Sequence, residues 1–190
     1  MGGGAQGPAP ESPPTLICPL RMRRQHPKAI LSPYVHEGMT ALEPGPGMGF
    51  FTLELARLVG PSGRVIATDL QPAMIARLKR RAGKAGLLDR IDARAASPRS
   101  LNVSDLNGSL DFTLAFAVVH EIADVQRFFS EVAAASKPGA KLLLAEPTGH
   151  VKPSEVEAEL KDAGAAGFAL VVHPAIPRMQ TALLEKAHNA

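Results

Sequence analysis

The chain has 190 residues, a mass of 20.0 kDa and a formal net charge of +3. A chain of this length buries about 70% of its unfolded surface, which suits one domain with a sheet covered by helices on both faces. The single cysteine excludes an internal disulfide, and the six histidines show no paired ligand spacing, so we expect no metal site. Without an apolar run of about 18 residues or a signal-peptide core, we expect no membrane association and a cytoplasmic location.

The N-terminal segment is dominated by glycine and proline, which cannot bury enough apolar surface to fold. We therefore predict a disordered tail over residues 1–16 and a single domain over residues 17–190. A short helix is expected within residues 19–31, followed by a turn at Ser32-Pro33. Tyr34 comes a few residues before the first strand, and we expect it either to reach a ligand or to pack as an ordinary core tyrosine.

Residues 39–71 are predicted to form a strand, a glycine turn, a helix and a second strand. The first strand ends at Glu43, glycines occupy every second position from 45 to 49, and the next strand ends at Asp69. A parallel sheet binds ligands at the carboxyl ends of its strands, and glycines there let the backbone approach a ligand closely. The following helix N-terminus favours an anionic group, and Asp69 is placed to accept hydrogen bonds from ribose hydroxyls.

This pattern suits either a dinucleotide or S-adenosylmethionine (SAM). The dinucleotide fingerprint G-x-G-x-x-G requires a last glycine where Phe50 or Thr52 stands. A nicotinamide or flavin enzyme is therefore the less favoured alternative.

The remaining elements alternate in the way that βαβ units do. We predict helices at 72–85, 124–135 and 153–163 and strands at 91–95, 110–119, 141–145, 168–173 and 179–185, with a polar loop at 99–109 and a turn at Lys137-Pro138-Gly139. The short connection between the last two strands predicts an antiparallel pair.

The run Glu43-Pro44-Gly45-Pro46-Gly47-Met48-Gly49 resembles motif I of class I SAM-dependent methyltransferases, and the chain looks most similar to the group containing the ubiquinone/menaquinone and arsenite methyltransferases. Over residues 27–186 the resemblance implies a Rossmann-like α/β sheet of seven strands, in the order 3-2-1-4-5-7-6 with strand 7 antiparallel. It implies SAM as the cofactor, in a crevice between strands 1 and 4. The cofactor-binding residues implied are Tyr34, Glu43, Gly45, Pro46, Gly47, Gly49, Phe50, Asp69, Leu70, Ser97 and Ala117. Many relatives carry an acid near Ser97 that accepts from the adenine amino group, and this chain does not; Ser97 or a backbone carbonyl is the expected substitute.

Two residues at predicted strand ends are candidates for catalysis. His120 follows the fourth strand and is read as a base or a substrate-orienting group, with a helix-entry residue paired to Glu121 as the alternative. Glu146 follows the fifth strand and is read as a substrate contact or a structural acid, and His150 is a weaker third candidate. The Asn/Asp-Pro-Pro-aromatic signature of nucleic-acid amino methyltransferases is replaced here by Ala117-Val118-Val119-His120, which argues against that activity.

We therefore expect a SAM-dependent methyltransferase that acts on a small-molecule acceptor. A SAM-binding subunit without catalysis and a methyltransferase acting on RNA or protein are the alternatives. The basic clusters at Arg21–Lys28 and Arg77–Lys84 are the reason for the RNA alternative, although such runs are usually solvated faces. The nucleophile and the oligomeric state stay open.

Overall fold

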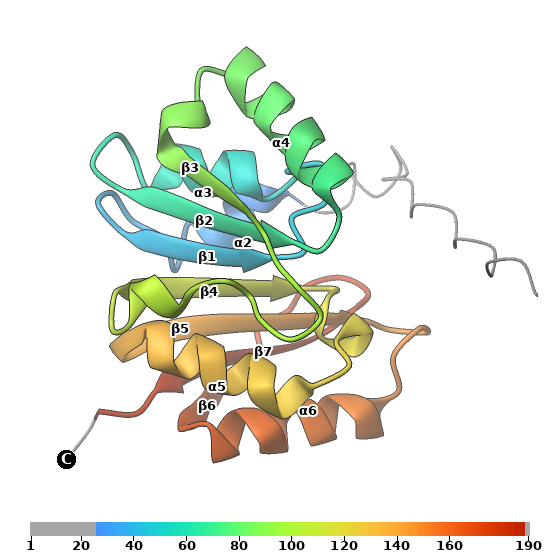
Figure 1. Ribbon diagram of the computed structural model, residues 1–190. Coiled ribbons are helices and arrows are strands. Elements are labelled where there is room, and N and C mark those ends of the chain that lie inside the picture. The colour runs from blue at the N-terminus through green and yellow to red at the C-terminus, as the bar shows by residue number, and fades with distance from the viewer. Residues whose placement is uncertain (1–25, 189–190) are drawn as a thin grey trace, which may run out of the picture.

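The computed structural model describes residues 26–188, in which seven strands form one sheet with helices on both faces (Figure 1). The strands are β1 (Thr40–Pro44), β2 (Arg64–Asp69), β3 (Ile91–Ala95), β4 (Leu110–Phe116), β5 (Ser136–Pro147), β6 (Phe168–Val172) and β7 (Met179–Lys186). The helices are α2 (Pro27–Leu31), α3 (Thr52–Leu58), α4 (Pro72–Lys84), α5 (Val125–Ala135) and α6 (Pro153–Ala165). Short 3-10 turns are η1 (Leu88–Arg90), η2 (Ser104–Leu106) and η3 (Val119–Glu121).

The sheet order is β3-β2-β1-β4-β5-β7-β6, and β7 runs antiparallel to both of its neighbours. Strands β1 to β5 pair in parallel. This confirms the predicted strand order, the α/β class and the antiparallel last strand. Because the order reverses between β1 and β4, the crevice outside their carboxyl ends is where such a fold binds ligands.

Two separate apolar clusters lie on the two faces of the sheet. One joins α2, α3 and α4 to one face, and the other joins α5 and α6 to the opposite face. Successive strand residues alternate between them: Ala41 belongs to the first cluster and Leu42 to the second, and Leu143 and Leu144 divide in the same way. Near-continuous apolar strands are expected when both faces of a parallel sheet are covered.

Most predicted boundaries agree with the structure to within about two residues, and the largest differences are at the end of β4 and the start of β5. Strand β4 ends at Phe116 rather than Val119, because Ala117 adopts a left-handed conformation with φ +53° and the chain turns into η3. The predicted turn at Lys137-Pro138-Gly139 lies inside β5, which begins at Ser136 opposite Leu110. The β4–β5 register shifts between Leu110 and Phe112, and the three residues lie in this irregularity, with Gly139 left-handed at φ +78°.

Some predictions concern residues that lie outside the described range. They are the disordered tail at 1–16, the start of the helix expected at 19–31, and the basic residues Arg21, Arg23 and Arg24. Helix α2 is the part of that expected helix that the structure describes. Across residues 26–188, no helix has the length and apolar character needed to cross a membrane.

Candidate functional site

A cavity of about 610 Å³ lies at the carboxyl ends of the central strands. Its walls come from the turn after β1, the end of β2, the segment after β3, and the segment from the end of β4 into α5. Six predicted cofactor-binding residues line it, namely Gly45, Gly47, Asp69, Leu70, Ser97 and Ala117. Residues from segments more than 70 positions apart therefore meet in one hollow.

The three positions of the turn after β1 need glycine for different structural reasons. All three have left-handed backbones, with φ +64° at Gly45, +53° at Gly47 and +80° at Gly49. A Cβ on Gly45 would lie 2.7 Å from Val118 Cγ2, and one on Gly49 would lie 2.4 Å from Leu78 Cδ1. A Cβ on Gly47 would meet no atom within 4 Å, although this residue lines the cavity. The turn therefore packs tightly at both ends and is open toward the cavity in the middle.

Glu43, at the end of β1, is 4% exposed, and its Oε2 has no hydrogen-bond partner. Burial raises the pKa of this carboxyl from 4.5 to about 7, because the charged form loses its hydration. The nearby Thr52 hydroxyl lowers the pKa in part, although no hydrogen bond between these two groups is formed in the structure. A buried acceptor without a partner beside a glycine turn is available to a polar or cationic ligand group.

Asp69 lies at the end of β2 on the cavity wall. Burial is the largest effect and raises the pKa of its carboxyl. The backbone N–H groups of Gln71 and Gly47 lower this pKa by less, and the nearby charge of Glu121, the smallest effect, raises it. The Gln71 N–H donates to Oδ1 over 2.8 Å. The other carboxylate oxygen, Oδ2, takes no part in that hydrogen bond, and a carboxylate oxygen on the cavity wall suits the hydroxyls of a ribose.

Ala117 is the residue at which β4 gives way to the cavity wall. Its φ of +53° is unusual for a residue with a Cβ, and its N–H donates to the Ala145 carbonyl over 2.7 Å. The left-handed backbone bends the chain so that Val118 meets Gly45 across the crevice. Strained backbones of this kind are concentrated at functional sites.

His120 and Glu146 contact each other next to the cavity rather than on its wall. Glu146 is completely buried, and its Oε1 accepts from the N–H groups of Val118 and Val119 over 3.3 and 2.8 Å. Its Oε2 lies 2.5 Å from Nδ1 of His120. Because a carboxylate accepts, we assign the His120 proton to Nδ1, which leaves the lone pair on Nε2. The His150 ring stands edge-on to His120, with centroids 5.1 Å apart.

The other predicted cofactor residues lie elsewhere. Pro46 is buried and accepts from the Gly49 N–H over 2.9 Å, and Phe50 stands edge-on to Phe51, so both shape the turn. Tyr34 stacks on Phe112 and lines a separate cavity of about 300 Å³ together with Asp111 and Lys137. We therefore leave Tyr34 out of the proposed site.

The sequence analysis missed a set of cavity-lining residues on helices and loops. They are Met74, Arg77, Leu101, Ile122, Arg127, Phe128 and Glu131. No local motif marks them, because a helix face is assigned to a cavity only by its packing. The basic run on α4 was read as a solvated face, yet Arg77 borders the cavity and Arg81 donates to the Met48 carbonyl.

The sheet order, the glycine turn and the acid after β2 together define the class I SAM-dependent methyltransferase fold. A family described as "Methyltransferase domain" matches residues 42–144, just over half of the chain, so the protein belongs to this family. An arsenite methyltransferase of Halobacterium salinarum is 28% identical over 64% of this chain and 30% of its own length. A ubiquinone/menaquinone biosynthesis C-methyltransferase of Pasteurella multocida is 27% identical over 59% of this chain and 41% of its own length.

A SAM-dependent methyltransferase from Aquifex aeolicus has the same fold, with a TM-score of 0.77 and 24% sequence identity over 90% of this chain and 94% of that one. The chain spans less than half the length of the two curated relatives described above. The family and the fold imply SAM as the cofactor.

The residues present fit SAM. The cofactor carries an ammonium group, and the buried Glu43 has an acceptor without a partner. It carries a ribose, and Asp69 lines the cavity wall beyond the turn. The space beside Gly47 is open, whereas the flanking glycines are closed by packed side chains.

Proposed function

We propose that the protein transfers a methyl group from SAM to a small-molecule acceptor. The observation that carries the proposal is the cavity of about 610 Å³, bounded on one side by the glycine turn and Asp69 and on the other by the segment that leads to His120. This volume falls within the range of about 300–1,000 Å³ usual for small-molecule sites.

The chain's own residues bind and align the reactants. SAM supplies an electrophilic methyl group on a sulfonium, so the protein has to place a nucleophile in line with it. Glu43 and the turn through Gly47 hold the methionine end of the cofactor, and Asp69 holds the ribose. Leu70 and Ala117 complete the cofactor side of the wall.

The His120–Glu146 pair provides a base for an acceptor that arrives protonated. Glu146 holds Nδ1 of His120, so Nε2 can take a proton from the acceptor as its nucleophile attacks the methyl group. Val118 and Val119 donate backbone hydrogen bonds to the same carboxylate. These hydrogen bonds fix the position of the Glu146 carboxylate. A fixed carboxylate in turn keeps the imidazole of a catalytic histidine oriented.

A small acceptor is favoured over RNA by the use made of the basic residues on α4. Arg81 is engaged with the Met48 carbonyl and Arg77 borders the cavity, which leaves Lys79, Arg80 and Lys84 as the exposed remainder of the cluster. Within residues 26–188, no structural feature favours the alternative of a SAM-binding subunit without catalysis, and that alternative becomes an outcome of the experiment.

The test is transfer of a labelled methyl group from SAM by the purified chain into cell extract fractionated into small molecules, RNA and protein. We expect label in the small-molecule fraction, with none when His120→Gln replaces the wild type. Label in RNA or protein instead would overturn the acceptor class. SAM binding by calorimetry without transfer to any fraction would overturn catalysis and favour the binding subunit.

A further inference from the structure

The adenine of SAM carries an exocyclic amine, a donor that loses binding energy when it is buried without an acceptor. The segment after β3 forms the cavity wall next to the ribose end, because the Ala96 N–H donates to the Asp69 carbonyl over 2.9 Å. From Ala96 to Leu101 this wall contains no carboxylate. A charged acceptor for the adenine amine would therefore have to come from another element of the wall.

The same segment then crosses the crevice to the other half of the molecule. In Figure 1 it runs from the end of β3 across the front of the sheet to η2, which lies beside α5. Arg94 holds the far end of this segment, donating to the Asn102 carbonyl over 2.9 Å and pairing with Asp105 over 2.6 Å. The loop therefore forms a fixed wall that joins the β3 side of the cavity to α5.

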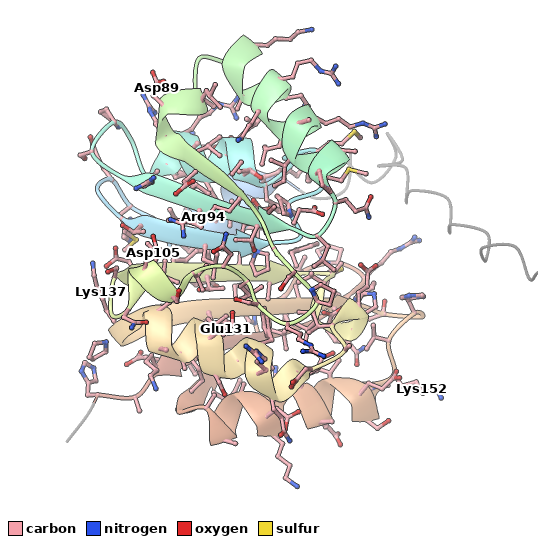
Figure 2. All side chains as sticks on the ribbon, in the orientation of Figure 1. Asp89, Arg94, Asp105, Glu131, Lys137 and Lys152 are labelled. Carbon is pink, nitrogen blue, oxygen red and sulfur yellow. The ribbon has the colours of Figure 1, made fainter. Side chains whose placement is uncertain are left out.

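Glu131 lies where the loop meets α5, and Figure 2 shows it in the middle of the molecule on that helix. Its Oε2 accepts from the Leu101 N–H over 2.7 Å and from the Ser100 hydroxyl over 3.2 Å. Its Oε1 accepts from Arg127 Nε over 3.2 Å. A carboxylate has about four acceptor positions, so one position on Oε1 is left for a ligand.

The surroundings of Glu131 suit a flat aromatic base. Leu101, Ile122 and Phe128 line the same cavity as Glu131, and Phe128 lies one helical turn before Glu131 on α5. Apolar walls with one oriented polar group at the end are typical of sites that recognise a ring with a polar edge. The Glu131 side chain is 21% exposed, so the protein holds it without sealing it off.

We propose that Glu131 on α5 recognises the exocyclic amine of the SAM adenine, in place of an acid on the segment after β3. The other carboxylates on the cavity wall are less suited. Asp124 is engaged in capping α5, where it accepts from the Arg127 N–H over 3.0 Å. Asp69 serves the ribose, and Glu121 is 69% exposed.

The test compares the affinities of S-adenosylhomocysteine and S-inosylhomocysteine, measured by calorimetry. The second ligand has a carbonyl oxygen where adenine has its amine, so it sets an acceptor against the Glu131 carboxylate. We expect wild type to bind the adenosyl ligand at least about tenfold tighter, the effect of leaving a charged acceptor unpaired. Glu131→Gln should lose this preference, because its amide can donate to the inosyl carbonyl.

Glu121→Gln is the matched control, since it changes another glutamate of the same cavity wall and should keep the preference. A wild type that binds both ligands equally, or a Glu131→Gln variant that weakens both equally, would show that Glu131 only anchors the loop and would overturn the proposal. Loss of the preference in Glu121→Gln alone would overturn it too. If Glu131→Gln melts too low to assay, Glu131→Asp withdraws the same acceptor and keeps its charge. All readouts are binding constants, so they do not depend on methyl transfer.

Discussion

His120 follows β4, Glu146 lies near the end of the neighbouring β5, and the two meet through Nδ1 and Oε2 at 2.5 Å, although 26 positions separate them in the chain. We predict that Glu146→Gln lowers kcat by about 10²–10⁴, as His120→Gln does, while SAM affinity stays unchanged. The Gln oxygen can still accept from Val118 and Val119, so its amide faces Nδ1 and moves the imidazole proton to Nε2. Steady-state kinetics with calorimetric SAM titration make the measurement.

A second variant separates the contribution of Glu146 to stability from its effect on catalysis. Glu146→Ala leaves the buried N–H of Val119 without its acceptor and should lower apo stability by about 1–3 kcal/mol, whereas Glu146→Gln should not. Full activity in Glu146→Gln with normal stability would remove the pair from the mechanism.

Gly45→Ala and Gly47→Ala should differ in what they damage. Each places a Cβ in a left-handed conformation, which costs about 1–2 kcal/mol. Only the Gly45 substitution also collides with Val118, at 2.7 Å, so it should lower the apo melting temperature further. The Cβ at Gly47 meets no protein atom and should instead weaken SAM binding. Melting curves and SAM titrations of both variants test this, and equal apo melting temperatures would contradict it.

Glu43 makes apo stability depend on pH between about 4.5 and about 7. Its folded pKa lies above the unfolded value, so the folded state binds the extra proton in that window and stability falls as pH rises through it. A shift of this size corresponds to a ceiling of about 3 kcal/mol. Glu43→Gln should be more stable than wild type at pH 8, and its free energy of unfolding should depend less steeply on pH.

Glu159 on α6 changes stability with pH in the same direction. The pH dependence of wild-type stability therefore contains contributions from both glutamates. Burial, followed by the charges of Glu146 and Glu155, raises the pKa of Glu159 to about 7. Denaturant titrations at pH 5 to 8 on wild type, Glu43→Gln and Glu159→Gln separate the two. A Glu43→Gln curve parallel to wild type would show that Glu43 does not titrate in this range.

Asp69→Asn should weaken SAM binding by about 1.5–3 kcal/mol, the contribution of hydrogen bonds to a charged group. The Asn oxygen can still accept from the Gln71 N–H, so apo stability should hold. Asp69→Ala removes that acceptor as well and should lower the apo melting temperature slightly. Unchanged SAM affinity in Asp69→Asn would remove this residue from the ribose site.

Ala117→Gly should stabilise the apo protein by about 0.5–1 kcal/mol. Glycine adopts φ +53° without the Cβ penalty, which outweighs the extra freedom that it gives the unfolded chain. Ala115→Gly, in the regular part of β4, is the control and should destabilise. Denaturant unfolding measures both, and a destabilised Ala117→Gly would mean that this backbone is not strained.

The features that could be predicted without coordinates are those specified over short stretches of chain. Three alternate glycines allow a left-handed turn at no steric cost, and a β-branched run ending at Asp69 places an acid at a strand end. Apolar periodicity located the helices, and the resemblance supplied the strand order, which the structure confirms. These signals depend on local backbone preference and side-chain spacing, and both can be read in the sequence.

Tertiary packing decided the rest. Lys137-Pro138-Gly139 has the composition of a turn, yet it lies inside β5, because Ser136 before it and Lys141 after it both pair with β4. Contact between His120 and Glu146, and between Glu131 and the loop 30 positions before it, depends on which elements lie side by side. Such contacts arise only when the sheet has closed and the helices have packed on it, because no residue type signals its partner across that distance.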